Sequence, residues 1–182
     1  MTTSTRPPEL TMPVASLAAL RDALVEAVGA DAAAQALRQA GYAAGDALFA
    51  FLQGTGDKPA GDVPARQFWS DLGRLFASRG WGQLTFSPAH DGVGALNAGD
   101  WFEARLDEAG SADQPSCHFT IGVLANVLGQ VAGGEVAVLE VECRSRGDDR
   151  CRFLFGGADA VYHVYEQMSA GTPPDSALAQ LR

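Results

Sequence analysis

Long apolar runs are missing from this chain of 182 residues. No stretch approaches the ~18 uninterrupted apolar residues that suggest a membrane-spanning helix, and residues 1–13 contain no apolar core of signal-peptide length. We therefore expect a protein without a membrane span, located in the cytoplasm. Internal repeats and low-complexity tracts are also missing, so the length favours a single domain with a core of ordinary size.

Positive charge is scarce as well. The chain has 13 Lys and Arg residues against 22 Asp and Glu residues, a formal net charge of −9. Nonspecific binding to nucleic acid requires clustered Lys and Arg that neutralise phosphates. The composition therefore disfavours a direct nucleic-acid partner.

Cysteine occurs only three times. An odd, small number of cysteines in a reducing compartment does not predict a disulfide framework. We therefore ask whether the cysteines bind a metal or take part in thiol chemistry.

Apolar residues at helical spacing fill the first half of the chain. Three helices are predicted, over residues 14–29, 31–53 and 65–80, with a loop at 54–64. Asp31 is placed to cap the second helix, because its side chain can accept a backbone N–H at a helix start. Phe68, Leu72 and Phe76 share one face of the third helix, and Gly80 suits its C-terminal end.

Short strand patterns and two further helices make up the second half. Gly, Pro, Asn and Asp break residues 81–110 into alternating runs, which predict two or three antiparallel strands. A helix follows, with Ser116 as its N-cap, then a hairpin around Gly147 and a closing helix over 158–171. This order predicts an α+β fold, an antiparallel sheet with N-terminal and flanking helices. We divide the chain into a flexible tail (1–13), a single domain (14–170) and a C-terminal tail (171–182).

Two cysteines face each other across the predicted hairpin. Cys143 and Cys151 are equally far from Gly147, so they can lie opposite or diagonally opposite each other. Alternation groups them on a buried face with the apolar residues Leu139, Val141, Phe153 and Phe155. The opposite face collects the charged residues Glu140, Glu142, Arg144, Arg146, Arg150 and Arg152.

With a third cysteine in the chain, the pair has more than one interpretation. Buried thiols without a ligand are the simplest interpretation, since free cysteine packs as a small apolar residue. Cys117, however, is predicted in the first helical turn, where the helix dipole favours a thiolate. Three thiols at a helix start and a hairpin tip can occupy three corners of a zinc tetrahedron. A thiol redox switch at Cys143 and Cys151, with release of zinc, is a further interpretation.

A fourth ligand would complete such a site. The candidates are His118, Glu140 and Glu142. His118 is awkwardly placed, because neighbouring residues on a helix point about 100° apart. Glu140 is expected on the face opposite Cys143, so a bulge near Val141 would have to turn its carboxylate toward the thiols. The hairpin arginines either offset the negative charge of the site from outside it or form a solvated face that balances nearby acidic residues.

The cysteine segment, residues 114–155, resembles the 4-vinyl reductase domain family. The resemblance rests on a Cys that opens a Gly- and Ala-containing helix, then on E-V-E-C in a strand and G-D-D-x-C-x-F after it. Relatives of this family include the aromatic-sensing input domains of phenol- and xylene-responsive bacterial activators. Residues 41–52 are similar, less specifically, to the long N-terminal helix of the family.

This resemblance implies a fold, a metal site and an oligomeric state. The implied ligands of a structural zinc are Cys117, Glu140, Cys143 and Cys151. The implied fold is α+β, akin to TRAPP-type trafficking subunits and haem-nitric-oxide-binding domains, and the implied assembly is a homodimer.

Two functions are compatible with these features. The first is a zinc-stabilised domain that binds or senses a small hydrophobic, aromatic or tetrapyrrole ligand, without a DNA-binding output of its own. Its support is the aromatic content around Phe86, Trp101, Phe102 and Phe119. The alternative is the namesake activity of the family, reduction of a vinyl group on a chlorophyll precursor, or an accessory role in that pathway. Residues 92–99 have Gly92 and Gly94 but lack the third glycine of a dinucleotide-binding turn, and we assign no catalytic residue.

Overall fold

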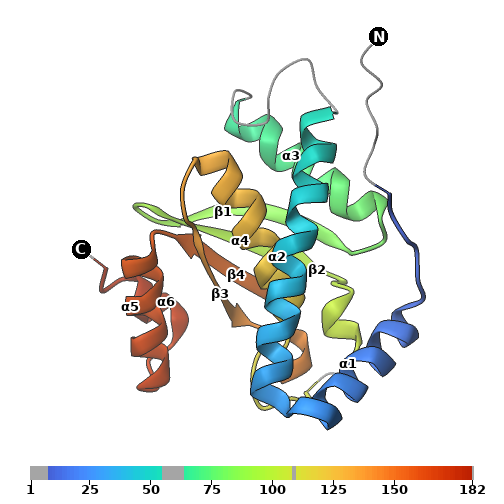
Figure 1. The fold of residues 1–182 in the computed structure, drawn as a ribbon. Helices are drawn as coiled ribbons and strands as arrows, with labels where there is room; N and C mark the ends of the chain where they lie inside the picture. The colour runs from blue at the N-terminus through green and yellow to red at the C-terminus, as the bar shows by residue number, and fades with distance from the viewer. Residues whose placement is uncertain (1–7, 55–63, 108–109, 182) are drawn as a thin grey trace.

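The computed structural model describes residues 8–54, 64–107 and 110–181, which form a four-stranded antiparallel sheet between two layers of helices (Figure 1). The predicted loop at 54–64 and the N-terminal tail therefore lie largely outside the described residues. The main elements are α1 (Val14–Val28), α2 (Ala30–Gly54), α3 (Ala65–Ser78), β1 (Gln83–His90), β2 (Val93–Gly99), α4 (His118–Ala132), β3 (Ala137–Glu142), β4 (Cys151–Gly156), α5 (Ala158–Ser169) and α6 (Pro174–Leu178). Two short 3-10 turns, η2 (Glu103–Arg105) and η3 (Arg144–Arg146), precede α4 and β4.

The sheet is built from two hairpins. Its strand order is β1-β2-β4-β3, and every neighbouring pair is antiparallel. The α+β prediction is confirmed, and the middle third supplies two strands, followed by η2. Antiparallel strands with short connections need no crossover helix, so the helices are free to cover both faces.

The larger core lies between the sheet and α2, α3 and α4. Phe68, Leu72 and Phe76 of α3 are buried there, as their spacing predicts. Gly80 follows α3 with φ +74, and the N–H of Trp81 donates to the carbonyl of Phe76, which closes the last turn. Glycine suits this position because a left-handed backbone carries no penalty without a Cβ.

A second, smaller core lies on the other face of the sheet. Val141 of β3 and Leu154 of β4 pack there against Val164 of α5. Within the segment set apart above as a C-terminal tail, α6 adds Ala177 and Leu178, which are buried. Leu181 packs against the same core, and burial of these apolar residues explains why the segment folds back onto the sheet.

Small residues allow α2 and α4 to cross closely. A Cβ on Gly122 of α4 would lie 2.0 Å from the backbone oxygen of Arg38, and one on Gly41 of α2 would lie 2.0 Å from the backbone oxygen of Phe119. A Cβ on Gly45 would instead meet the side chain of Asn126, at 2.5 Å from its Cβ. Because these glycines have no side chains, the N-terminal part of α4 lies directly against α2.

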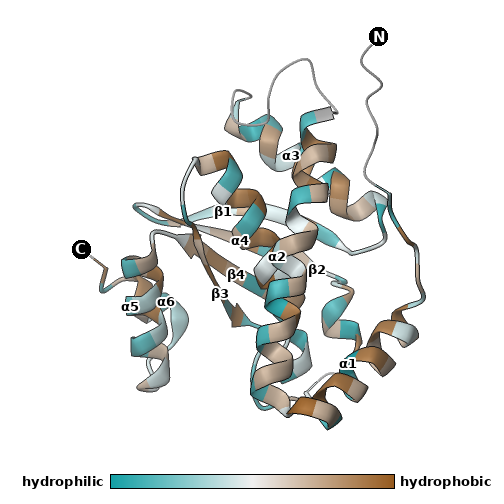
Figure 2. Cartoon of the chain, in the orientation of Figure 1, coloured by the Kyte–Doolittle hydropathy of each residue, from teal (hydrophilic) through white to brown (hydrophobic). Residues whose placement is uncertain are grey.

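The first helix contacts the body through Leu17, which packs against the larger core, and through Arg21. None of its residues is buried, and Leu20, Val25 and Val28 are exposed; Figure 2 shows the apolar colouring along α1. Arg21 pairs with Asp107 at 2.7 Å. Asp31, expected as an N-cap, lies in the first turn of α2 instead. None of the described helices has the length and apolar character needed to cross a bilayer.

Replacing Gly122 by Ala should destabilise the fold, because the added methyl meets backbone atoms that cannot move independently. We expect a loss of about 1–3 kcal/mol in the free energy of unfolding, measured by urea denaturation. Gly134→Ala is the matched control, since a Cβ there meets nothing within 4 Å. Equal stability of the two variants would contradict the close crossing.

Candidate metal centre

Four side chains from three parts of the chain converge beneath the hairpin tip. Cys117 is the N-cap of α4, Glu140 lies in β3, Cys143 follows β3 and Cys151 begins β4. All four are buried, and one ligand atom from each lies within 4.8 Å of the others. The residues expected together from the sequence are therefore together in the fold.

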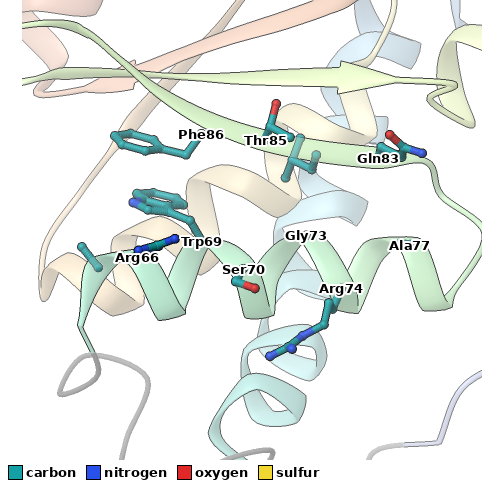
Figure 3. A pocket seen from close by; sticks show the side chains of 11 residues that line it. Arg66, Trp69, Ser70, Gly73, Arg74, Ala77, Gln83, Thr85 and Phe86 are labelled. Carbon is teal, nitrogen blue, oxygen red and sulfur yellow. The ribbon is translucent and has the colours of Figure 1, made fainter.

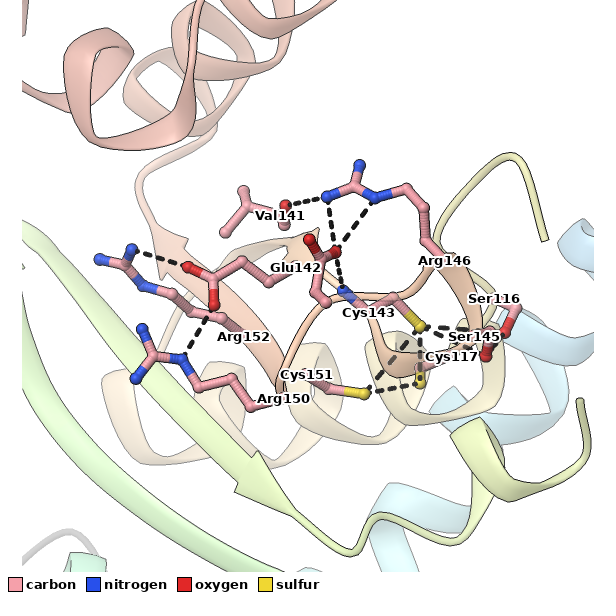
Figure 4. A network of polar contacts seen from close by, with 11 residues as sticks. Ser116, Cys117, Val141, Glu142, Cys143, Ser145, Arg146, Arg150, Cys151 and Arg152 are labelled. Carbon is pink, nitrogen blue, oxygen red and sulfur yellow. Dashed lines mark hydrogen bonds and ion pairs between the residues drawn. The ribbon is translucent and has the colours of Figure 1, made fainter. Parts of the chain in front are cut away.

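The three sulfurs form a nearly equilateral triangle, joined by dashed lines in Figure 4. The Sγ atom of Cys117 lies 3.9 Å from that of Cys143 and 3.8 Å from that of Cys151, and Cys143 and Cys151 are 4.0 Å apart. All three cysteines are free. Two sulfurs bound tetrahedrally at a Zn–S distance of about 2.3 Å would lie about 3.8 Å apart. The sulfur spacing is thus compatible with a zinc site and far too long for a disulfide.

A bulge in β3 turns Glu140 toward the thiols. Glu140 pairs with Phe153 and Glu142 pairs with Arg152, so the register shifts by one residue at Val141. The simple alternation predicted above was therefore wrong for this strand: Val141 faces the second core, whereas Glu140 shares the face of Phe153. An extra residue in one strand changes which face its neighbours occupy.

The two carboxylate oxygens of Glu140 have different surroundings. Oε2 accepts the backbone N–H of Cys117 at 2.9 Å, whereas Oε1 is buried without a hydrogen-bond partner. Burial, together with the charge of Cys143, raises the pKa of Glu140 well above its usual range. A buried acceptor without a partner is costly, and a cation among the sulfurs would satisfy it. The donor set therefore fits a divalent metal.

The other candidate ligands point elsewhere. Nδ1 of His118 lies 3.3 Å from a guanidinium nitrogen of Arg38 on α2. Glu142 forms ion pairs with Arg150 and Arg152 at 2.9 and 3.3 Å. Neither residue joins the cluster of ligand atoms.

The hairpin arginines form ion pairs with acidic side chains. Arg146 pairs with Asp148 at 2.8 Å and Arg144 with Asp100 at 3.6 Å. Among the residues that the structure describes, these guanidinium groups bind carboxylates or a backbone carbonyl, and none donates to a cysteine sulfur. The contacts therefore favour the interpretation in which the arginines balance acidic neighbours.

Hydroxyl groups, rather than arginines, lie next to the sulfurs. Ser145 Oγ lies 3.5 Å from Cys143 Sγ and 2.7 Å from Ser116 Oγ. Ser116 in turn donates to Asp107, the ion-pair partner of Arg21. Ser116 was expected to be the N-cap of α4. It forms these hydrogen bonds instead, and Cys117 occupies the N-cap position.

The pKa values of the thiols are shifted in opposite directions. Hydrogen bonds from the Cys117 and Cys151 thiols hold the pKa of Cys143 far below its usual range, and contact with Cys143 raises the pKa of Cys117. Cys143 is therefore the sulfur that these contacts prepare as a thiolate.

Glu103 was missed by the sequence reasoning. It lies in η2, is 2% exposed, and accepts the backbone N–H groups of Phe119 and Thr120 at 2.7 and 2.8 Å. The Thr120 hydroxyl also donates to it, and Trp101 Nε1 donates to that hydroxyl at 2.7 Å. Two acidic side chains, Glu103 and Glu140, thus cap the same helix start. No local sequence pattern marks Glu103 as a cap, because Glu103 lies 14 residues before Cys117 in the chain.

Glu103 should make stability depend on pH. Burial raises its pKa from 4.5 to about 7, against the opposing effect of its hydrogen bonds. Between these values the unfolded carboxyl is ionised while the folded one keeps its proton, so stability falls as pH rises from 4.5 to 7, by about 3 kcal/mol. Glu103→Gln stays neutral, so its free energy of unfolding relative to the native chain should rise across that window. Urea titrations at several pH values measure the difference, and a constant difference would contradict the assignment.

Comparison with known proteins finds one family model and two solved structures to which this chain is similar. Residues 103–156 match the family model of the 4-vinyl reductase domain. The phenol-responsive sensory domain of the transcription activator PoxR, in a crystal structure with phenol, has a similar fold, with a TM-score of 0.73, 20% identity, and coverage of 91% of this chain and 84% of that chain. A vinyl-4-reductase family protein from Methanocaldococcus jannaschii superposes with a TM-score of 0.50, 20% identity and 84% coverage of both chains. No curated protein matches the sequence.

The matched segment contains Glu103 and all four candidate metal ligands, so the resemblance of this chain to the 4-vinyl reductase domain family is confirmed.

Proposed function

We propose that this protein is a small-molecule-binding domain for hydrophobic or aromatic ligands, held together by a structural zinc ion. The observation that carries the ligand-binding part is the fold shared with a phenol-responsive sensory domain over 91% of the chain. The zinc part rests on the geometry of the four buried donors. Three unpaired thiols suit a reducing compartment, so we place the protein in the cytoplasm.

The proposed zinc ligands are Cys117, Glu140, Cys143 and Cys151. Bound there, the ion supplies a cross-link between the start of α4 and the β3–β4 hairpin. Four protein ligands complete a tetrahedron, which is typical of structural rather than catalytic zinc. The sulfur spacing and the free Oε1 of Glu140 support this set.

Metal analysis of the purified protein should give about one zinc per chain. Glu140→Gln should weaken zinc binding by at least about tenfold in a chelator competition, whereas Glu142→Gln, whose carboxylate pairs with Arg150 and Arg152, should leave it unchanged.

Cys151→Ser tests the coupling of the metal to folding. A chelator should lower the urea midpoint of the native chain and leave that of the variant unchanged, because zinc binding contributes to folding. A metal-free protein of full stability would rule out the zinc site.

A cluster of aromatic rings is the proposed ligand site. Trp81 lies 4.8 Å from Phe102 and 5.8 Å from Phe119 between ring centroids, and Phe102 also contacts Trp101. Trp81 and Phe119 are only partly buried, which supports access from the surface. The cluster also adjoins the metal centre, since Phe119 follows Cys117 by two residues at the start of α4.

The polar groups beside this cluster favour an apolar ligand. Trp101, Thr120 and Glu103 are already bonded to one another. A ligand hydroxyl would therefore have to break one of these bonds, whereas a bare ring needs no polar partner. Within the proposed class, simple aromatic hydrocarbons should bind at least as well as phenols.

Toluene and phenol should both raise the Tm, by roughly 5–10 °C at a hundredfold excess over Kd, with toluene at least as effective. Trp81→Ala should abolish the shift, and Tyr162→Ala, an exposed aromatic on α5, should preserve it. The shift is read within each variant, so a general loss of stability does not affect it. A response to a magnesium porphyrin alone would favour the tetrapyrrole role instead.

A homodimer is part of the proposal. The apolar residues Leu20, Val25 and Val28 of α1 are exposed, and no residue of this helix is buried. A helix that carries apolar residues and remains uncovered favours association with a second copy.

A further inference from the structure

The first turn of α4 belongs to both of the sites proposed above. Cys117, the N-cap of this helix, contributes a sulfur to the metal centre. Phe119, two residues later, lies 5.8 Å from Trp81 and 6.4 Å from Phe102 between ring centroids. A change in the position of this turn therefore moves a candidate metal ligand and a ring of the aromatic cluster together.

Glu103 holds this turn from the side of the aromatic cluster. Its carboxylate oxygens accept the N–H groups of Phe119 and Thr120 at 2.7 and 2.8 Å. It also follows Trp101 and Phe102, two members of the cluster, directly in the chain. Amides in the first turn of a helix have no partner within the helix, so the position of the turn depends on acceptors outside it.

The Thr120 hydroxyl extends this contact into the cluster. It accepts a hydrogen bond from Trp101 Nε1 at 2.7 Å and donates one to Glu103 Oε2 at 2.7 Å. All three side chains are buried, so water does not replace a bond that is lost. The position of the Trp101 indole and the position of the helix start are therefore linked by side-chain hydrogen bonds.

Glu140 holds the same turn from the side of the metal centre. Its Oε2 accepts the N–H of Cys117 at 2.9 Å, and its Oε1 has no hydrogen-bond partner. Metal and aromatic ligand thus favour the same ordered position of one helical turn. When one of them has ordered the turn, the other binds with a smaller loss of conformational entropy, which gives positive cooperativity.

We propose that Glu103 is a positioning residue that couples the aromatic cluster to the metal centre, so that an aromatic ligand and zinc each strengthen the binding of the other. The coupling rests on the ligand and metal sites of the proposed function and adds a means of regulation to them. Through it, occupancy of the cluster is transmitted to the β3–β4 hairpin, which supplies Cys143 and Cys151 to the same centre.

Zinc affinity measured with and without toluene tests the coupling. In a chelator competition, saturating toluene should lower the Kd for zinc by at least about fivefold in the native chain. The measured quantity is the ratio of the two Kd values within one protein, so a variant that merely binds zinc less well does not change it.

Two substitutions of Thr120 form a matched pair. Thr120→Val has nearly the same shape but no hydroxyl, so it breaks the contact between Trp101 and Glu103 and should reduce the effect of toluene to less than about twofold. Thr120→Ser keeps the hydroxyl and should keep the effect. Glu103→Gln should also lose it, because the NH₂ group of the amide cannot accept a backbone N–H.

Val164→Ala is the control for a coupling that acts only through global stability. Val164 is buried in the second core, on the other face of the sheet, and belongs to neither site. This variant should be less stable than the native chain and should keep the full effect of toluene on zinc affinity.

The outcomes separate the coupling from the proposed function. Toluene that raises the Tm but leaves the zinc Kd of the native chain unchanged would overturn the coupling alone. Coupling that persists in both Thr120→Val and Glu103→Gln would overturn the role of Glu103. A protein that does not bind toluene at all would contradict the proposed ligand site and the coupling together.

Discussion

The start of α4 is the point on which the arrangement of this protein depends. Amide groups at a helix N-terminus have no partner within the helix. Here two buried carboxylates accept them: Glu140, from the sheet, binds the N–H of Cys117, and Glu103, from η2, binds those of Phe119 and Thr120. The helix layer, the sheet and the connection between them are therefore joined at one turn of helix.

The glycine contacts between α2 and α4 make that junction possible. Because Gly41 and Gly122 lack side chains, α2 lies directly against the first turns of α4. This fixes the position of Cys117 relative to the hairpin, so that three sulfurs meet at 3.8–4.0 Å. A zinc ion at this place would link the same elements that the carboxylates already join, which is why we expect metal and fold to be lost together.

The aromatic cluster and the groove between α3 and β1 (Figure 3) are built from different residues. The cluster around Trp81 and Phe102 is partly buried and adjoins the helix start, whereas the groove beside Trp69 is open to solvent.

Local patterns in the sequence determined most of the elements. Helical spacing predicted α1, α2 and α3 to within a few residues, and the positions of Cys143 and Cys151 around Gly147 indicated the hairpin and brought three candidate sulfur donors into view. Such features depend on residues close together in the chain. The face of Glu140 was decided by a one-residue shift at Val141, which alternation alone does not reveal. The role of Glu103 was decided by long-range packing, because only the folded chain brings η2 to the start of α4. The sequence and its family resemblance therefore named the candidate donors, and the tertiary structure decided which way they point.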